Sequence, residues 1–291
     1  MSAALRAGLF VAGLAVAFGA AFLAGTAIDP DAGDDATGAH ADATAHGADA
    51  QRAHSADSAA RPARLVLDDP GFEPGAAETL RFRVVDAQGR TVRDFDVAHR
   101  RAMHAIAVRR DLTGYRHVHP RPTRDGGWAV EIAFPEAGPQ RVFADFVSRG
   151  EPHTLSADLD VAGRYAPRPL PAPATTTADA GDGYAVDVAA VGSERRFTVT
   201  RDGIPVDDVE PYLGARGHLV ALREGDLAFQ HVHPRDRATE GREIRFDVAL
   251  PGSRRHRLFL QFKHDGKVRT AAFTEPAGAP TRSHGEDGHG H

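Results

Sequence analysis

Histidine is the residue type in this sequence whose spacing suggests chemistry. The 291 residues include 16 His and no Cys. Two segments, Met103–Pro120 and Gly217–Pro234, each hold three of these His with the same spacing, 114 residues apart along the chain. The six are His104, His117 and His119 in the first segment and His218, His231 and His233 in the second. Because neutral imidazole is a common ligand of Cu(II) and Zn(II), each set is a candidate metal site.

A β-hairpin would bring the three imidazoles of each segment together. In the first segment, two strand-like stretches flank a turn near residue 111, and this arrangement places His104 opposite His119. The same register places Ile106 opposite His117. Opposed residues point to one face of a sheet with Cβ atoms about 5 Å apart, and residues two apart in a strand share a face. The second segment repeats the pattern, so the sequence predicts one three-histidine cluster in each copy.

His99 is a candidate fourth ligand in the first copy. It lies five residues before His104, so it reaches the cluster only if the chain bends at Arg100-Arg101. The corresponding position in the second copy is Leu213, which leaves that site poorer by one ligand. Met103 should point away from His104, into a core. Copper is the expected ion, with zinc as the alternative, because both bind imidazole nitrogen.

The same histidines are also compatible with a structural role or a pH-sensing role. Imidazoles in a sheet can bridge backbone groups near strand ends and so be structural. Clustered His with an ordinary pKa of about 6.5 could instead repel one another on acidification and sense pH. His256 and His264 are spare candidate ligands in the second copy.

The rest of the composition excludes several classes of function. Without Cys the chain has no disulfides, no Cys-ligated zinc and no thiol nucleophile. A formal net charge of −5 argues against a nucleic-acid partner. The sequence contains no Walker A loop, HExxH, dinucleotide fingerprint or nucleophile elbow. We therefore expect a protein that is not an enzyme.

Short strands would position the histidines. Apolar and polar residues alternate over 80–84, 128–134 and 244–250, and Gly-containing turns separate such runs. No helical period appears after the N-terminal segment. The expected fold class is all-β, with two tandem Ig-like or cupredoxin-like β-sandwich domains after a single N-terminal transmembrane helix.

Composition divides the chain into six parts. Residues 7–28 are uncharged and mainly apolar, which suits a membrane-spanning helix or a signal peptide. The charges around them predict an N-terminus in the cytoplasm and the rest of the chain outside it, tethered to the cell membrane by one span, or secreted if the segment is cleaved. The parts are an anchor or signal peptide over 1–28, a disordered stalk over 29–60, sandwich repeats over 61–162 and 183–275, a Pro/Thr-rich linker over 163–182, and a disordered His-rich tail over 276–291.

Two blocks of the sequence resemble a known group of proteins. FDVxH…MHxIxVRRDLTGYxHxHP stands at Phe95–Pro120, and PYLGAxGHLVALREGDLAFxHVHP stands at Pro211–Pro234. With these blocks the chain resembles bacterial, actinobacterial-type, membrane-anchored or secreted two-repeat proteins labelled as secreted or heavy-metal-binding. The resemblance covers about residues 64–274 and implies an extracytoplasmic location and a β-sandwich fold.

These observations predict an extracytoplasmic metal-binding protein whose histidine clusters hold or pass on copper. Its expected partners are the metal ion, the membrane through the N-terminal helix, and an envelope metal transporter or other envelope protein. The alternative is a cell-envelope adhesion or interaction module, not an enzyme, in which the histidines are structural.

Overall fold

The computed structural model describes residues 63–173, 176–232, 234, 242–250 and 252–277. The predicted anchor and stalk and residues 278–291 of the predicted His-rich tail lie outside these residues, and so do His233 and the side chain of His231. Within the described residues, no helix is long and apolar enough to cross a membrane.

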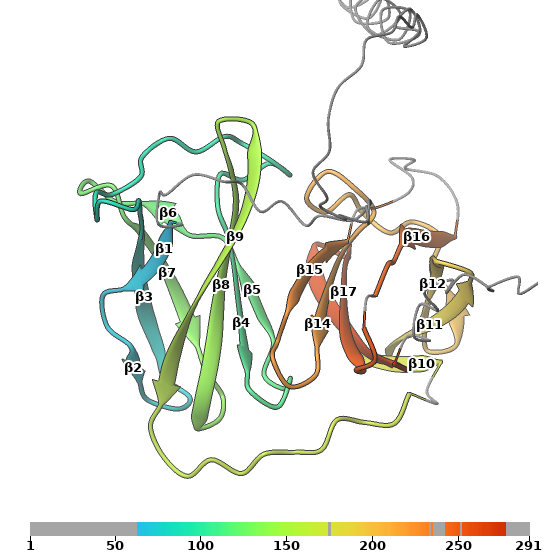
Figure 1. Cartoon of the computed structure of the whole chain (residues 1–291). Coiled ribbons are helices and arrows are strands. Elements are labelled where there is room, and N and C mark those ends of the chain that lie inside the picture. Colours follow the sequence, from blue (N-terminus) through green and yellow to red (C-terminus); the bar gives the residue numbers. More distant parts are fainter. Residues whose placement is uncertain (1–62, 174–175, 233, 235–241, 251, 278–291) are drawn as a thin grey trace, which may run out of the picture. The chain divides into compact units, whose positions relative to one another are not determined.

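The first repeat is a sandwich of two β-sheets (Figure 1). The first sheet has the order β1-β3-β7-β6, with β1 (Arg64–Leu67), β3 (Ala77–Val85), β7 (Trp128–Ala133) and β6 (Arg121–Pro122). The second has the order β2-β9-β8-β4-β5, with β2 (Gly71–Phe72), β9 (Glu151–Val161), β8 (Gly138–Ser148), β4 (His104–Arg109) and β5 (Arg116–Val118). All pairs are antiparallel except β2 with β9.

Alternate side chains of both sheets fill the space between them. Leu80, Phe82 and Val84 of β3 are at most 1% exposed, as their period-2 spacing predicts. Ala105 of β4 enters the same core from the second sheet, and so does Met103 just before it. The prediction that Met103 is a core residue is confirmed.

The second repeat is also a pair of sheets. One has the order β10-β11-β12-β13, with β16 also paired to β12, and is formed by β10 (Thr177–Gly181), β11 (Tyr184–Val191), β12 (Glu194–Arg201), β13 (Ile204–Pro205) and β16 (Glu243–Asp247). The other has the order β15-β14-β17-β18, with β15 (Phe229–Val232), β14 (Gly217–Arg223), β17 (His256–His264) and β18 (Lys267–Glu275). Phe197, Phe246 and Phe262 lie in the core between these sheets.

One boundary differs from the sequence prediction. The residues predicted as a Pro/Thr-rich linker, 163–182, include Thr177–Gly181, which form the edge strand β10 and pair with β11. The composition was misleading because the burial of β10 alternates only between exposed and intermediate, so the strand carries no run of large apolar residues.

The duplication seen in the sequence is also present in the strand pairing. Ile106 of β4 pairs with His117 of β5, and Val220 of β14 pairs with His231 of β15. Strands β8 and β17 pair with β4 and β14 in the same way. The predicted hairpin register is therefore confirmed in both copies.

A further hydrophobic core forms on the outer face of the histidine-bearing sheets. Both repeats belong to one compact unit of the chain. Ile106 and Val108 of β4 point away from the first sandwich and form a buried cluster with Val220 and Leu222 of β14. The outer face of an antiparallel sheet is commonly polar, so this apolar face requires a partner, and the other repeat supplies it.

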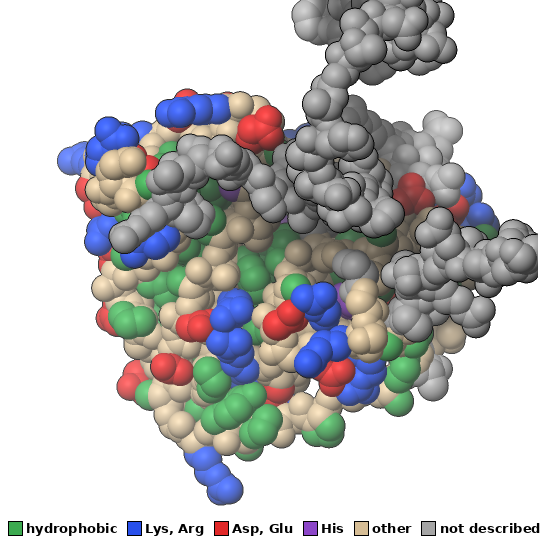
Figure 2. All heavy atoms as spheres, in the orientation of Figure 1, with side chains coloured by type: hydrophobic (Ala, Val, Ile, Leu, Met, Phe, Trp, Pro, Cys, Tyr) green, Lys and Arg blue, Asp and Glu red, His purple; other side chains and the backbone are tan. Residues whose placement is uncertain are grey.

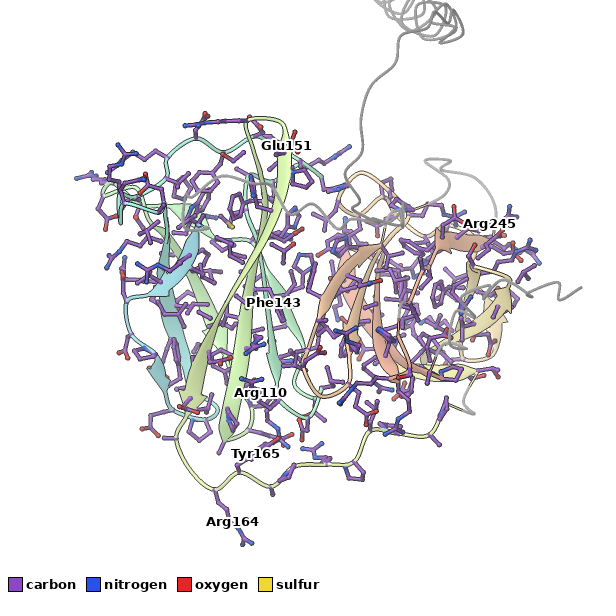
Figure 3. The ribbon with its side chains drawn as sticks, in the orientation of Figure 1. Arg110, Phe143, Glu151, Arg164, Tyr165 and Arg245 are labelled. Carbon is purple, nitrogen blue, oxygen red and sulfur yellow. The ribbon has the colours of Figure 1, made fainter. Side chains whose placement is uncertain are left out.

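Equivalent aromatic residues of the two repeats pack against each other in this inter-repeat core. The rings of Tyr115 and Phe259 stack with centroids 4.1 Å apart, and those of Phe143 and Phe229 lie 5.2 Å apart. Phe229 is the counterpart of Tyr115, and Phe259 is the counterpart of Phe143 (labelled on β8 in Figure 3). Each repeat thus offers the other the same surface, as in an isologous dimer interface.

Candidate metal centre

The three histidines of the first repeat converge at one end of this shared face. His104 begins β4, points to the same side as Ile106, and is 3% exposed. His117 lies in β5 and His119 directly follows that strand. One ring nitrogen from each of the three lies within 4.8 Å of those of the other two. On the face of the molecule drawn in Figure 2, only small parts of histidine side chains are visible.

The hairpin that carries His117 and His119 is held by a buried arginine. The Arg109 guanidinium donates from Nε to Asp111 at 2.9 Å and from Nη1 to Glu136 at 2.7 Å. It also donates to the Ala166 carbonyl oxygen and lies over the ring of Tyr165, which is labelled in Figure 3. Burial acts to raise the pKa of Asp111, but hydrogen bonds from Arg109, Thr113 and the Arg168 backbone outweigh it and hold this pKa well below its usual range.

Carbonyl oxygens hold the outer nitrogens of His104 and His117. His104 Nε2 lies 3.4 Å from the carbonyl oxygen of Ala98, and His117 Nδ1 lies 2.7 Å from Oε1 of Gln261. Because a carbonyl oxygen only accepts hydrogen bonds, Gln261 assigns the ring proton of His117 to Nδ1 and leaves Nε2 as a lone pair. That lone pair faces His104 Nδ1 at 3.1 Å, a hydrogen-bond distance when Nδ1 carries the His104 ring proton.

The third imidazole also has a nitrogen available. His119 Nε2 is buried and has no hydrogen-bond partner within the described residues. A buried polar atom without a partner costs free energy, so it marks a place where a bound ion would stabilise the protein.

Burial keeps the imidazoles of His117 and His119 neutral. Desolvation lowers the pKa of His117 to about 3, and the neighbouring His104 acts in the same direction. Desolvation also lowers the pKa of His119 to about 4, with His104 and Arg101 contributing. Both groups are therefore ready to donate lone pairs at neutral pH, and neither would titrate during mild acidification, which argues against the pH-sensor alternative.

The bend that His99 requires is present. Ala98 and Arg101 pair across a two-residue turn in which His99 and Arg100 have φ of 49° and 64°. Two positive φ angles define a type I′ turn, which reverses the chain tightly. The turn brings the His99 ring to 6.2 Å from that of His104, outside the group of three converging ligands.

The equivalent turn in the second repeat has the same backbone conformation. Tyr212 pairs with Ala215 around Leu213 and Gly214, whose φ angles are 54° and 89°. The bend is therefore a property of both copies, while an imidazole at this position occurs only in the first.

His218, expected in a separate site, lies beside the first cluster. Its ring stacks on that of His117 with centroids 4.7 Å apart and on that of His104 at 6.1 Å. His104 and His218 are equivalent residues of the two repeats, so they approach each other across the inter-repeat face. The structure thus brings four of the predicted histidines into one cluster, with His99 at its edge.

The other predicted residues are placed as follows. His231 lies in β15 in the predicted register, and its side chain and His233 lie outside the described part. His264 instead contacts Tyr184 Oη at 2.7 Å and Asp208 at 2.9 Å. His256 is buried in β17, and in the described residues neither it nor His264 joins a group of three convergent ligands.

Gln261 is the contributor that sequence reasoning missed. It lies on β17 of the second repeat and reaches His117 of the first. Its counterpart in the first repeat is Asp145, so the duplication gives no hint of it. A signal for the inter-repeat contact does exist, because 103–108 and 217–222 are almost continuously apolar apart from the histidine, a pattern typical of strands buried on both faces.

Comparison with known families identifies the two repeats. A family model described as a domain of unknown function, DUF8832, matches residues 60–163 and 180–278. The chain belongs to the DUF8832 family. The first matched region contains His104, His117 and His119, and the second contains His218, so the histidine cluster is built from both parts of the DUF8832 match.

Solved structures align with the DUF8832 protein at low identity and low TM-score. The Escherichia coli adhesin FdeC shares 12% identity at a TM-score of 0.26, covering 76% of this chain and 66% of its own. The BSP domain of a biofilm-associated protein shares 10% at 0.23, with 76% and 30% covered. The FN1-FN3 domains of chicken CNTN1 share 12% at 0.21, with 74% and 68% covered. No curated protein matches the chain.

Proposed function

We propose that this DUF8832 protein binds a copper ion through His104, His117 and His119. One observation carries the proposal: His104 Nδ1 and His117 Nε2 face each other at 3.1 Å while their other nitrogens are turned to carbonyl oxygens. A metal ion can take the place of the proton between these nitrogens, because His104 can carry its ring proton on Nε2, toward the Ala98 carbonyl oxygen, instead of on Nδ1. The His117 imidazole is neutral at pH 7, since its pKa is about 3, so protonation does not compete with the ion there.

The distances suit a first-row metal ion. With metal–nitrogen bonds of about 2.0 Å, adjacent ligand nitrogens in a tetrahedral site lie about 3.3 Å apart. The pair at 3.1 Å already has this separation, and the third nitrogen lies within 4.8 Å. Small movements of His119, which sits beyond the end of β5, would complete the set.

The surrounding groups resemble those that support metal ligands. A ligating histidine usually donates its second ring N–H to a carbonyl or carboxylate, which fixes the tautomer and the orientation of the ring. Ala98 and Gln261 hold these positions. His218 and His99 lie close enough to add or exchange a ligand as an ion enters. Copper is preferred to zinc, because Cu(II) binds nitrogen ligands most tightly among the divalent first-row ions.

The biological role follows from the predicted topology. An N-terminal anchor with both repeats outside the cytoplasm would hold copper at the membrane surface and pass it to an envelope transporter or another envelope protein. If the N-terminal segment is cleaved, the same site would act in a secreted protein. The proposed role is binding and transfer of the ion, without a catalytic step.

A structural role for the histidines is the alternative, and the position of the cluster supports it. The cluster lies at the contact between repeats, where His117 bonds to Gln261 and stacks on His218. Those contacts would also suit a cell-envelope adhesion or interaction module in which the histidines only hold two sandwiches together.

Copper titration of the full chain distinguishes the two functions. The test variant is His104→Ala/His117→Ala/His119→Ala, and the matched control is His284→Ala/His289→Ala/His291→Ala in the tail, which removes the same number of imidazoles. We expect Cu(II) to raise the Tm of the wild type and the tail variant but not of the test variant, with nitrogen hyperfine coupling in the electron paramagnetic resonance spectrum lost in parallel. Equal Cu(II) binding by all three proteins, with no rise in Tm, would support the structural role instead. If Zn(II) binds and Cu(II) does not, the same three histidines would form a zinc site.

A further inference from the structure

A cleft lies beside the histidine cluster and is lined by both repeats. Its volume is about 540 Å³, within the range of small-ligand sites. His117 and His119 line it from the first repeat, and Tyr212, Gln261 and Thr270 line it from the second.

Three arginines also line this cleft, and none of the described residues that line it is acidic. Arg100 and Arg101 come from the turn after His99, and Arg116 comes from β5. In the part of the chain that the structure describes, Arg100 and Arg101 form no ion pair. The Arg116 guanidinium donates only to the backbone oxygens of Ala133 and Tyr115, at 3.2 and 2.9 Å.

The charge of Arg101 acts on lining residues from both repeats. It lowers the pKa of His119 and counteracts the burial that raises the pKa of Tyr212 to about 12. Arg101 therefore lies within electrostatic reach of residues from both repeats. A cleft with this balance of charge attracts anions.

The other residues that line the cleft favour an anion that also has an apolar part. Leu213 and Val268 provide apolar walls, Val268 being 43% exposed, and Thr270 adds a hydroxyl. Guanidinium groups bind carboxylates through paired, charge-assisted hydrogen bonds. A short aliphatic chain would cover the apolar walls, which a bare inorganic anion cannot do.

We propose that this cleft is a binding site for a small organic carboxylate, held by Arg100 and Arg101 against the Leu213 and Val268 walls. The site is formed by protein groups alone, so it does not depend on the proposed metal. A carboxylate bound there would lie beside the face of the cluster that His117 and His119 present to the cleft.

Equilibrium dialysis of the metal-free full chain against labelled succinate tests this proposal. We expect saturable binding of one succinate per chain, and no binding of uncharged succinamide. Arg101→Gln should weaken succinate binding about tenfold or more, because it removes a charge-assisted contact. Arg81→Gln, at an exposed position on β3 outside the cleft, is the matched control and should bind like the wild type.

A second variant tests the cleft without changing its charge. Val268→Trp narrows the space and should weaken succinate binding while leaving the Tm unchanged, since residue 268 is partly exposed. The proposal is overturned if succinate does not saturate, if Arg81→Gln binds as weakly as Arg101→Gln, or if inorganic phosphate displaces succinate at concentrations below that of succinate itself. His104→Ala removes a proposed copper ligand whose side chain does not line the cleft, so this variant, measured without metal, should keep succinate binding. Failure of the copper site and failure of this site are therefore separable.

Discussion

His117 of the first repeat donates a hydrogen bond from Nδ1 to Oε1 of Gln261 in the second, over 2.7 Å. The two residues are 144 positions apart in the chain. This bond fixes which nitrogen of His117 faces the cluster, so it joins the docking of the repeats to the chemistry of the candidate site. Gln261 Nε2 in turn lies 3.3 Å from Thr270 Oγ1, which orients the amide.

Removing this bond should weaken metal binding without removing a ligand. For Gln261→Ala we expect a 10- to 100-fold loss of Cu(II) affinity, the usual effect of losing a group that orients a ligating histidine. Gln261→Glu keeps an acceptor and adds a negative charge near the ion, so it should retain or increase affinity. Competition titration against a chelator of known affinity measures both. Equal losses in the two variants would contradict the orienting role.

The low pKa values of His117 and His119 predict an acid-sensitive stability. Each pKa lies below the value of about 6.5 expected in the unfolded chain, so the unfolded state binds more protons as pH falls. The stabilisation from neutral burial is complete above about pH 6.5 and is lost as pH falls toward 4 and then 3. Urea unfolding of metal-free protein at several pH values should show a loss on the order of a few kcal/mol.

A leucine variant isolates this effect from the other titrating groups. His117→Leu removes the buried base while keeping an apolar side chain of similar size, so its free energy of unfolding should depend less steeply on pH between 6.5 and 4. An identical slope in the wild type and His117→Leu would show that other groups control the acid response.

The stack of Tyr115 on Phe259 should decide whether the repeats unfold together. Phe259→Ala removes a ring that is 3% exposed, for which the expected cost is about 3–5 kcal/mol. Because each sandwich keeps its own core, we expect calorimetry to show two transitions in place of one, together with weaker Cu(II) binding. Phe273→Ala, inside the second sandwich, is the control, and it should lower the stability of that repeat alone.

A glycine variant at His99 should separate the effect of backbone strain from the effect of metal binding. His99 has φ of 49°, a conformation that costs an ordinary residue about 1–2 kcal/mol and glycine almost nothing. His99→Gly should therefore leave the free energy of unfolding unchanged or higher. If the His99 imidazole contributes to the ion, the same variant will bind Cu(II) more weakly. A variant with unchanged Cu(II) affinity would remove His99 from the site.

Several features of the fold were predictable because they depend on local pattern. Alternation at Leu80, Phe82 and Val84 predicts a strand with one buried face, and the burial of all three confirms it. The register of Ile106 opposite His117 follows from hairpin geometry and is also confirmed. The edge strand Thr177–Gly181 was missed, because its stability comes from pairing with β11 and not from apolar side chains of its own.

The duplication, the all-β class and the convergence of His104, His117 and His119 could be predicted, because each depends on spacing within one hairpin or one repeat. Three further features emerged only from the fold: the outer faces of the two histidine sheets meet, His218 joins the first cluster, and Gln261 orients His117. Apolar residues on both faces of β4 and β14 indicate that these strands are buried, but they do not identify the partner that buries them. Partners more than 100 residues apart are selected by the complementarity of whole surfaces, which no local pattern encodes.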